Sequence, residues 1–345
     1  MHCDNRHTGQ ALVEGPKNVP NIIFSYHIDE PFASDPIIDK NNSVYICGNN
    51  NLYAIDSTGN LLWQYPILEG VTGTPCLSST ENAIFVPSNN GIYSLTLDGT
   101  FNWKLSLPSD AGHIEYKNND IYFVCAKYLY SVNKDGIINW NIKPDYISSV
   151  YSTPSLTSQG KIIIPAYIQY DFIRTYYLLC YGSDGTLLWE KELSTGNITP
   201  VTISSTDIIY CGYSVFSGAM GWGHLFAFDD EGNTIWVNGW SPRGTYSALY
   251  NDEIIIAGGY WGSMSTFNAL TGDKFFLHDI TNSISPIFDS KGKIYTTDIY
   301  TLHCLGLDGE TIWTYPLNPA TQCAIGSNKR LYIGSKSDDL YCLGD

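Results

Sequence analysis

One short motif returns along the whole chain: a glycine, three further residues and then an aromatic residue. The copies read GNLLW (Trp63), GTFNW (Trp103), GIINW (Trp140), GTLLW (Trp189), GNTIW (Trp236), GDKFF (Phe276 in the Trp position) and GETIW (Trp313). Successive copies lie 40, 37, 49, 47, 40 and 37 residues apart. Because the period is nearly constant, it predicts an architecture built by repeating one structural unit.

Each copy is surrounded by the same local pattern. Alternating runs such as LYAID, IYSLT and LFAFD precede the turn, and runs such as VYICG and DIYFV precede those. Such alternation is typical of β-strands, and the Asp-Gly pairs between the runs are typical of hairpin turns, where Gly adopts positive φ. A further strand is expected near Thr74, Thr153, Thr199 and Ser285, each of which is followed by Pro. Four strands per unit and this period predict propeller blades.

The last unit is split between the two ends of the chain. The run LYIGSKSDDLYCLGD reaches Asp345 without its Trp strand, whereas NIIFSYHI, starting at Asn21, matches NLLWQYPI with Phe24 in the Trp position. We therefore predict an all-β fold: an eight-bladed β-propeller of four-stranded antiparallel blades over residues 20–345, closed by the N-terminal strand, which completes the last blade. Residues 1–19 are expected to be a flexible tail. Each Trp is expected to pack one blade against the next.

The composition fits a single folded, acidic propeller, which we expect to be monomeric. Hydrophobic residues make up 43% of the chain and charged residues 15%, so apolar surface for a core is ample. The formal net charge of −16 would repel a phosphate backbone, and we expect no nucleic-acid partner. The nine cysteines are odd in number and lie mostly inside apolar runs, which favours reduced thiols over disulfides.

The sequence also bears on the compartment. No run approaches the roughly 18 apolar residues of a transmembrane segment, and the first residues lack the apolar core of a signal peptide. As written, the chain reads as cytoplasmic. The alternative is a membrane-anchored or periplasmic lipoprotein, because Cys3 followed by a polar tether resembles the lipidated start of a mature bacterial lipoprotein.

The repeat resembles that of a known family. An alternating strand, a D-x-x-G or D-G turn and a strand ending in Trp are similar to the pyrroloquinoline-quinone-type (PQQ-like) repeat of the quinoprotein alcohol dehydrogenase-like propellers, over about residues 20 to 345. The resemblance implies eight blades. This family contains calcium-dependent quinoprotein dehydrogenases and also non-enzymatic scaffolds, such as the lipoprotein subunit of the outer-membrane β-barrel assembly machine. The chain is closest in style to these BamB-type scaffolds.

Features of the enzymatic branch are not found in the sequence. That branch uses a vicinal disulfide against the quinone, but no two cysteines are adjacent, and no calcium site with a catalytic Asp can be placed. The seven histidines show no H-x-H or H-E-x-x-H spacing, so a metal site has no support. We therefore predict a non-catalytic binding protein without cofactor or metal. The alternative is a quinone- or metal-dependent enzyme with its site in the central funnel, either a dehydrogenase-like oxidoreductase with PQQ and calcium or a propeller lyase.

Blades four to six carry the features that suggest a binding site. Units four and five are about ten residues longer, and the extra residues lie between the second and third strands. Exposed aromatic and Arg residues in Gly-rich loops are typical of binding hot spots, and function concentrates on loops. We predict a protein partner, or a carbohydrate. The alternative is that these aromatics form a local core, and that the blade-four residues only extend a hairpin. The predicted binding residues are Tyr170, Phe172, Arg174, Trp222, His224, Trp240, Arg243 and Trp261.

Overall fold

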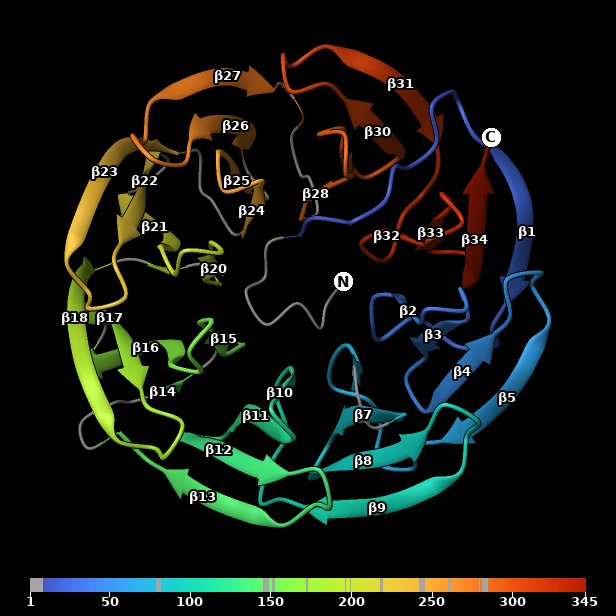
Figure 1. Ribbon diagram of the computed structural model, residues 1–345, viewed down its shortest axis with the longest axis horizontal. Helices are drawn as coiled ribbons and strands as arrows, with labels where there is room; N and C mark the ends of the chain where they lie inside the picture. The colour runs from blue at the N-terminus through green and yellow to red at the C-terminus, as the bar shows by residue number, and fades with distance from the viewer. Residues whose placement is uncertain are drawn as a thin grey trace. The chain divides into compact units, whose positions relative to one another are not determined.

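A computed structural model describes residues 9–78, 82–144, 149–150, 153–171, 173–195, 197–198, 200–217, 220–241, 246–259, 262–278, 280 and 285–345. Within these ranges the strands form eight antiparallel sheets, and there is no helix (Figure 1). The protein is thus an all-β, eight-bladed propeller, as the repeat predicts. No helix that could cross a membrane occurs in the described ranges. By its contacts the chain divides into two units, residues 9–114 with 284–345 and residues 115–283, and each holds four blades.

The first unit holds blades 1, 2, 7 and 8. Blade 1 is β2 (Ile37–Ile38), β3 (Val44–Cys47), β4 (Asn51–Ile55) and β5 (Leu61–Pro66). Blade 2 is β6 (Cys76–Leu77), β7 (Ala83–Ser88), β8 (Gly91–Thr96) and β9 (Phe101–Ser106). Blade 7 is β28 (Ile287–Phe288), β29 (Ile294–Thr297), β30 (Thr301–Leu305) and β31 (Thr311–Pro316). Blade 8 is β32 (Ala324–Ile325), β33 (Leu331–Gly334), β34 (Asp339–Gly344) and β1 (Asn21–His27).

The second unit holds blades 3 to 6. Blade 3 is β10 (Glu115–Lys117), β11 (Asp120–Cys125), β12 (Tyr128–Asn133) and β13 (Ile138–Ile142). Blade 4 is β14 (Ser149–Val150), β15 (Ser155–Leu156), β16 (Ile162–Tyr170), β17 (Ile173–Tyr181) and β18 (Leu187–Thr195). Blade 5 is β19 (Asn197–Ile198), β20 (Thr202–Ile203), β21 (Ile209–Ser217), β22 (Met220–Phe228) and β23 (Thr234–Ser241). Blade 6 is β24 (Tyr246–Tyr250), β25 (Ile254–Gly259), β26 (Gly262–Asn268) and β27 (Lys274–His278).

Blades 4 and 5 keep the four-stranded plan although each has five strands. In blade 4 both β14 and β15 pair with β16, and in blade 5 both β19 and β20 pair with β21. In these two blades, two short strands therefore occupy the position of the first strand.

The split blade is assembled as predicted. Strand β1 pairs antiparallel with β34, and Phe24 lies opposite Cys342 just as Trp63 lies opposite Ala54 in blade 1. The ring of Phe24 also lies 6.3 Å from that of Tyr332, close to the 5.9 Å between Trp63 and Tyr45. The N-terminal strand thus completes blade 8, with Phe24 in the Trp position.

The recurring spacing of Gly and Trp reflects contacts between neighbouring blades. Trp63 of blade 1 lies against the turn of blade 2, where its indole nitrogen donates a hydrogen bond to the main-chain oxygen of Leu97 at 3.0 Å. A Cβ atom on Gly99 in that turn would lie 2.7 Å from the indole, and the φ of Gly99 is +87°. Only glycine combines this backbone with so close an approach. The indole nitrogens of Trp140, Trp189 and Trp236 donate in the same way to the turns of blades 4, 5 and 6.

Within each unit, the apolar core lies between neighbouring sheets. The middle strands β3 and β7 are buried along their whole length, whereas β5 is exposed or half-buried. One apolar cluster joins buried residues of blades 1 and 2, with Trp63 packed against its side. Two-sided burial explains why the middle strands read as continuous apolar runs.

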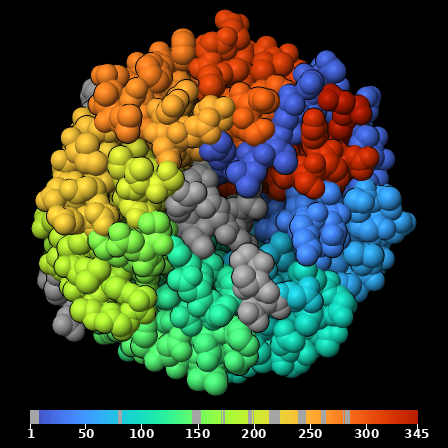
Figure 2. Space-filling view, viewed as in Figure 1, coloured from blue at the N-terminus to red at the C-terminus, as the bar shows by residue number. Residues whose placement is uncertain are grey.

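The segment before β1 contacts the first unit. Residues 9–18, which we call the N-terminal arm, lie against blades 7 and 8, and the arm is seen in blue beside their orange and red atoms (Figure 2). This segment belongs to the tail expected over residues 1–19. Residues 1–8 of that tail lie outside the described residues, so its flexibility there stays a prediction.

Candidate partner-binding site

The second and third strands of blades 4 and 5 are among the longest in the described part of the chain. Strands β16, β17, β21 and β22 each contain nine residues, whereas β3 and β4 of blade 1 contain four and five. The extra residues therefore lie where the sequence places them, between the second and third strands, but most of them continue the ladder. The two hairpins extend their sheets, as the alternative interpretation proposes for blade 4.

The connection from blade 3 reaches blade 4 toward the tip of the blade 4 hairpin. Strand β14 pairs with Ala166 and Tyr167, toward the tip of β16, whereas β15 pairs with Ile162 and Ile163 at its base. The chain therefore passes the tip first as it comes from blade 3. The long hairpin of blade 4 and the connection from blade 3 therefore lie on the same face of the blade.

The tip of the blade 4 hairpin is organised around Arg174. Arg174 lies opposite Gln169 in the ladder, and its Nε donates a hydrogen bond to Gln169 Oε1 at 3.0 Å. The guanidinium also lies 4.8 Å from the ring centroid of Tyr167, within the range of a cation–π contact. Both Arg174 and Gln169 are exposed. A pre-ordered, exposed guanidinium is a group that partners bind readily, because little side-chain entropy remains to be lost.

Two tyrosines support this tip from below. Tyr167 and Tyr176 lie directly opposite each other, with ring centroids 5.5 Å apart, and only 1% of Tyr176 is exposed. On the neighbouring rung, the Tyr177 hydroxyl donates to Glu192 Oε2 of β18 at 3.1 Å. Tyr176 therefore acts as packing, while Tyr177 links the hairpin to the edge strand.

The blade 5 hairpin faces the blade 4 hairpin through a shared apolar cluster. His224 lies opposite Tyr213, and its ring centroid is 6.1 Å from that of Phe226, which stacks on Phe228 at 5.6 Å. Phe228 and Tyr176 belong to the buried cluster that joins the two blades, and Phe226 and Tyr167 pack against it. Aromatic packing between the hairpins holds the exposed tip in place.

The structure describes the side chains of only two of the eight predicted binding residues. Arg174 is exposed at the hairpin tip and His224 is half-buried beside Phe226. Three others have a described backbone only, and their side chains lie outside the described part: Tyr170 on β16, Trp222 on β22 and Trp240 on β23. Phe172, Arg243 and Trp261 lie outside the described residues altogether. For all eight residues the role in binding stays a prediction.

Sequence reasoning missed Gln169 and Tyr167, which position Arg174. Their signal is the register: Gln169 pairs with Arg174 one rung from the pair of Tyr170 and Ile173, at which the hairpin turns. Asp171, with φ of +53°, marks that turn, because Asp tolerates the left-handed region.

Histidines do not cluster in the described part of the chain. The five histidines in the described ranges lie on separate elements: His27, His113, His224, His278 and His303. Nowhere in those ranges do three or more His, Cys, Asp or Glu side chains group so that they could hold a metal ion. Burial raises the pKa of the Cys180 and Cys211 thiols to about 12, so both remain protonated at neutral pH.

Comparison with known proteins supports the fold. The crystal structure of BamB from Moraxella catarrhalis is similar, with a TM-score of 0.75 and 15% identity over 95% of this chain and 100% of that one. The Dos1 propeller has a TM-score of 0.76 and 10% identity over 94% and 95% of the two chains. A computationally designed protein, Ika8, has a TM-score of 0.69 and 14% identity over 96% and 100%. No family model and no curated protein matches the sequence.

Similarity at these identities shows a β-propeller and nothing finer. The same fold carries many unrelated functions, so a role has to be argued from the site.

Proposed function

We propose that this chain is a non-catalytic scaffold propeller of the quinoprotein-like superfamily, which binds a protein partner through the hairpin tips of blades 4 and 5. The observation that carries the proposal is the exposed guanidinium of Arg174, fixed by Gln169 and Tyr167 at the end of a nine-residue hairpin. Arg is enriched among hot spots, where a few anchored side chains supply most of the binding energy.

The rigid base of the hairpins supports a binding role. Tyr176, Phe226 and Phe228 pack the two hairpins together, so the tips are presented without a large ordering cost on association. Similarity to BamB and to the Dos1 propeller is consistent with a scaffold, and the PQQ-like character of the repeat is part of the proposal. A carbohydrate ligand is the second candidate, since the predicted Trp222 and Trp261 could stack on sugar rings.

The test compares two matched variants in affinity capture from the native extract. The first carries Gln169→Ala and Arg174→Ala at the blade 4 tip. The control carries Lys127→Ala and Tyr128→Ala at the short β11–β12 hairpin of blade 3, where both residues are also exposed. Captured proteins are identified by mass spectrometry, and the dissociation constant of each is then measured with purified components.

We expect the blade 4 variant to bind the captured protein about 10-fold or more weakly, because truncation of a hot spot costs about 2 kcal/mol or more and about 1.4 kcal/mol is a factor of ten. The blade 3 control should bind like the wild type. Equal affinity of both variants would exclude the blade 4 tip. A Tyr170→Ala, Trp222→Ala, Trp261→Ala variant then tests the predicted aromatics, and elemental analysis with an absorption spectrum tests the cofactor alternative.

A further inference from the structure

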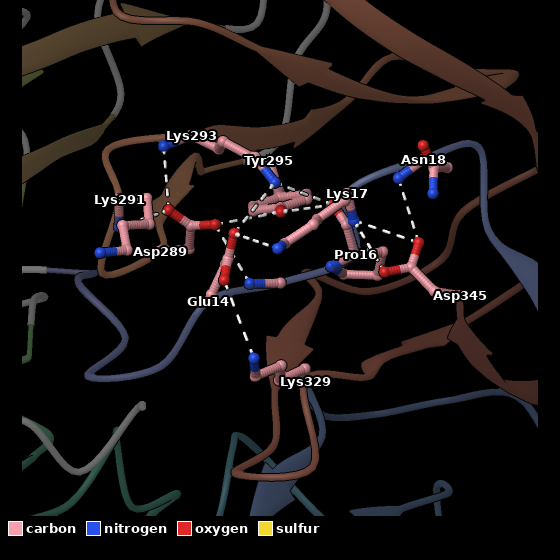
Figure 3. Close-up of polar contacts among 11 residues, drawn as sticks. Glu14, Pro16, Lys17, Asn18, Asp289, Lys291, Lys293, Tyr295, Lys329 and Asp345 are labelled. Atoms are coloured by element: carbon pink, nitrogen blue, oxygen red, sulfur yellow. Dashed lines mark hydrogen bonds and ion pairs between the residues drawn. The ribbon is translucent and has the colours of Figure 1, made fainter.

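The N-terminal arm, residues 9–18, is held on blades 7 and 8 in the manner of a bound peptide (Figure 3). The Ala11 nitrogen donates to the Phe288 oxygen at 2.7 Å, and the Phe288 nitrogen donates to the Gly9 oxygen at 2.8 Å. The Ser290 nitrogen donates to the Val13 oxygen at 3.0 Å. Because β28 uses its other edge to pair with β29, the arm adds an extended segment to the free edge of blade 7.

Alternate side chains of the arm face the protein. Ala11 is 4% exposed and belongs to the cluster of buried residues that joins blades 7 and 8, and Val13 packs against that cluster. Leu12, between them, is 92% exposed. This alternation is that of a strand laid on an edge. It buries little apolar surface, so the hydrophobic contribution to docking is small.

The arm also supplies one hydrogen-bond acceptor that a hairpin turn supplies in other blades. The Tyr45 hydroxyl of blade 1 donates to the Leu97 oxygen in the turn of blade 2, at 3.4 Å, and the Tyr210 hydroxyl of blade 5 donates to Ala269 of blade 6, at 3.1 Å. In blade 8 no turn joins β34 to β1, because the two strands come from opposite ends of the sequence. The corresponding Tyr295 hydroxyl of blade 7 donates instead to the Pro16 oxygen of the arm, at 3.3 Å.

Lysine side chains of blades 7 and 8 lie close to one acidic residue of the arm, Glu14. The Glu14 carboxylate lies 3.9 Å from the ammonium of Lys293, on blade 7, and 3.8 Å from that of Lys329, on blade 8. Lys17 of the arm itself is a third cation, at 3.9 Å. Glu14 and Lys293 are each less than a fifth exposed, so their attraction is screened less than that of a surface pair.

The next two residues of the arm, Gly15 and Pro16, form main-chain hydrogen bonds with blade 7, and Gly15 also approaches it closely. The Gly15 nitrogen donates to the buried carboxylate of Asp289 at 3.1 Å, and a Cβ atom at position 15 would lie 2.7 Å from Cζ of Tyr295. The Pro16 oxygen accepts from both Tyr295 and Lys293. The contacts therefore select an acidic residue, then Gly, then a residue whose carbonyl faces the blade.

We propose that this edge of blades 7 and 8 is a peptide-binding site for an extended segment that carries an acidic residue followed by Gly, as Glu14 and Gly15 do, and that the N-terminal arm is its resident, exchangeable ligand. A segment of the same chemistry, supplied by another molecule, binds the same site when the arm is displaced. The arm competes as an intramolecular ligand, so its effective concentration is high and a free peptide binds weakly to the wild-type chain.

The test uses the full-length chain and a fluorescein-labelled peptide of residues 9–19, GQALVEGPKNV, with binding followed by fluorescence anisotropy. Gly15→Val in the full chain places a branched side chain against Tyr295 and displaces the arm, while the blade itself is unaltered. We expect this variant to bind the peptide at least 10-fold more tightly than the wild type. The control is Leu12→Ser, a change at an exposed arm residue, which should leave the weak binding of the wild type unchanged.

Specificity is tested by reversing the charges. A peptide with Glu14→Lys should bind the Gly15→Val chain at least 10-fold more weakly than the original peptide. Adding Lys293→Glu and Lys329→Glu to that chain should reverse the preference, which simple destabilisation would not do. Circular dichroism first establishes that each variant is folded. The proposal is overturned if the folded Gly15→Val chain binds no more tightly than the wild type, or binds both peptides equally.

Discussion

The indole nitrogen of Trp63 and the main-chain oxygen of Leu97 form a 3.0 Å hydrogen bond that joins the fourth strand of blade 1 to the turn of blade 2. The residues are 34 positions apart, close to one repeat. The bond recurs between blades 4 and 5 and between blades 5 and 6, from Trp189 to Asp230 and from Trp236 to Ala269. The Trp of the repeat therefore contributes a directional contact as well as apolar area.

Trp63→Phe should destabilise the protein by about 1–2 kcal/mol, because it keeps an aromatic ring but removes the shorter of the two hydrogen bonds that the Leu97 oxygen accepts. Urea unfolding followed by far-ultraviolet circular dichroism measures the change. The control is Leu62→Ala, next to it on the same strand and half exposed, which should change the free energy of unfolding by less than about 0.5 kcal/mol. Equal effects of the two changes would contradict a specific role for the indole.

Gly99→Ala and Gly160→Ala separate backbone strain from steric overlap. Both glycines have positive φ, +87° and +84°, but a Cβ at position 99 would meet Trp63, whereas nothing lies within 4 Å at position 160. Gly160→Ala should cost about 1–2 kcal/mol from backbone strain alone. Gly99→Ala should cost about 1–3 kcal/mol more, from overpacking. Thermal and urea unfolding of both variants give the difference, and a Gly160→Ala variant as unstable as Gly99→Ala would refute the assignment.

The contact between the arm and Asp345 should weaken in acid. Desolvation raises the pKa of the Asp345 carboxyl, but the N–H groups of Lys17 and Asn18 and the charges of Lys293 and Lys17 outweigh it, and the net pKa lies below 3.8. A carboxylate with a lowered pKa stabilises the folded state above its unfolded pKa and loses that contribution as the pH falls through the folded value. The contact should therefore be complete above about pH 5 and lost below 3.8.

Amide chemical shifts of Lys17 and Asn18, followed by NMR from pH 6 to pH 2.5, report this loss. Asp345→Asn removes the titrating side chain. In that variant the pH-dependent shift of the two amides should therefore disappear. An unchanged transition in Asp345→Asn would assign the pH dependence to another group.

The cysteine thiols should be unreactive in the folded protein. Eight of the nine cysteines are described, and all eight are free and buried. Burial also raises the pKa of the Cys304 and Cys323 thiols to about 12. In a Cys3→Ser variant at pH 8, Ellman's reagent should label fewer than one thiol rapidly in the native protein and all eight after unfolding in guanidinium chloride. Rapid labelling of several native thiols would mean that the blades open readily.

The sequence by itself determined the blades. Turn glycines, alternating strands and the Trp position are each encoded within about ten residues, so a repeated local pattern predicts a repeated local structure. The same pattern placed Phe24 and Phe276 in Trp positions, and the registers opposite Cys342 and Thr266 agree with it. Even the completion of blade 8 by β1 could be predicted, since the two ends supply complementary parts of one repeat.

Only the tertiary structure decided how the departures from the repeat are used. Extra residues in blades 4 and 5 could form loops or longer strands, and the ladder from Tyr167 to Arg174 shows longer strands. The arm offers no period at all: Gly15 meets Asp289 across 274 residues, through one amide and one buried carboxylate. Local patterns report a residue's neighbours along the chain. Which distant edge a non-repeating segment binds depends on the side chains and free hydrogen-bonding groups that the folded blades present.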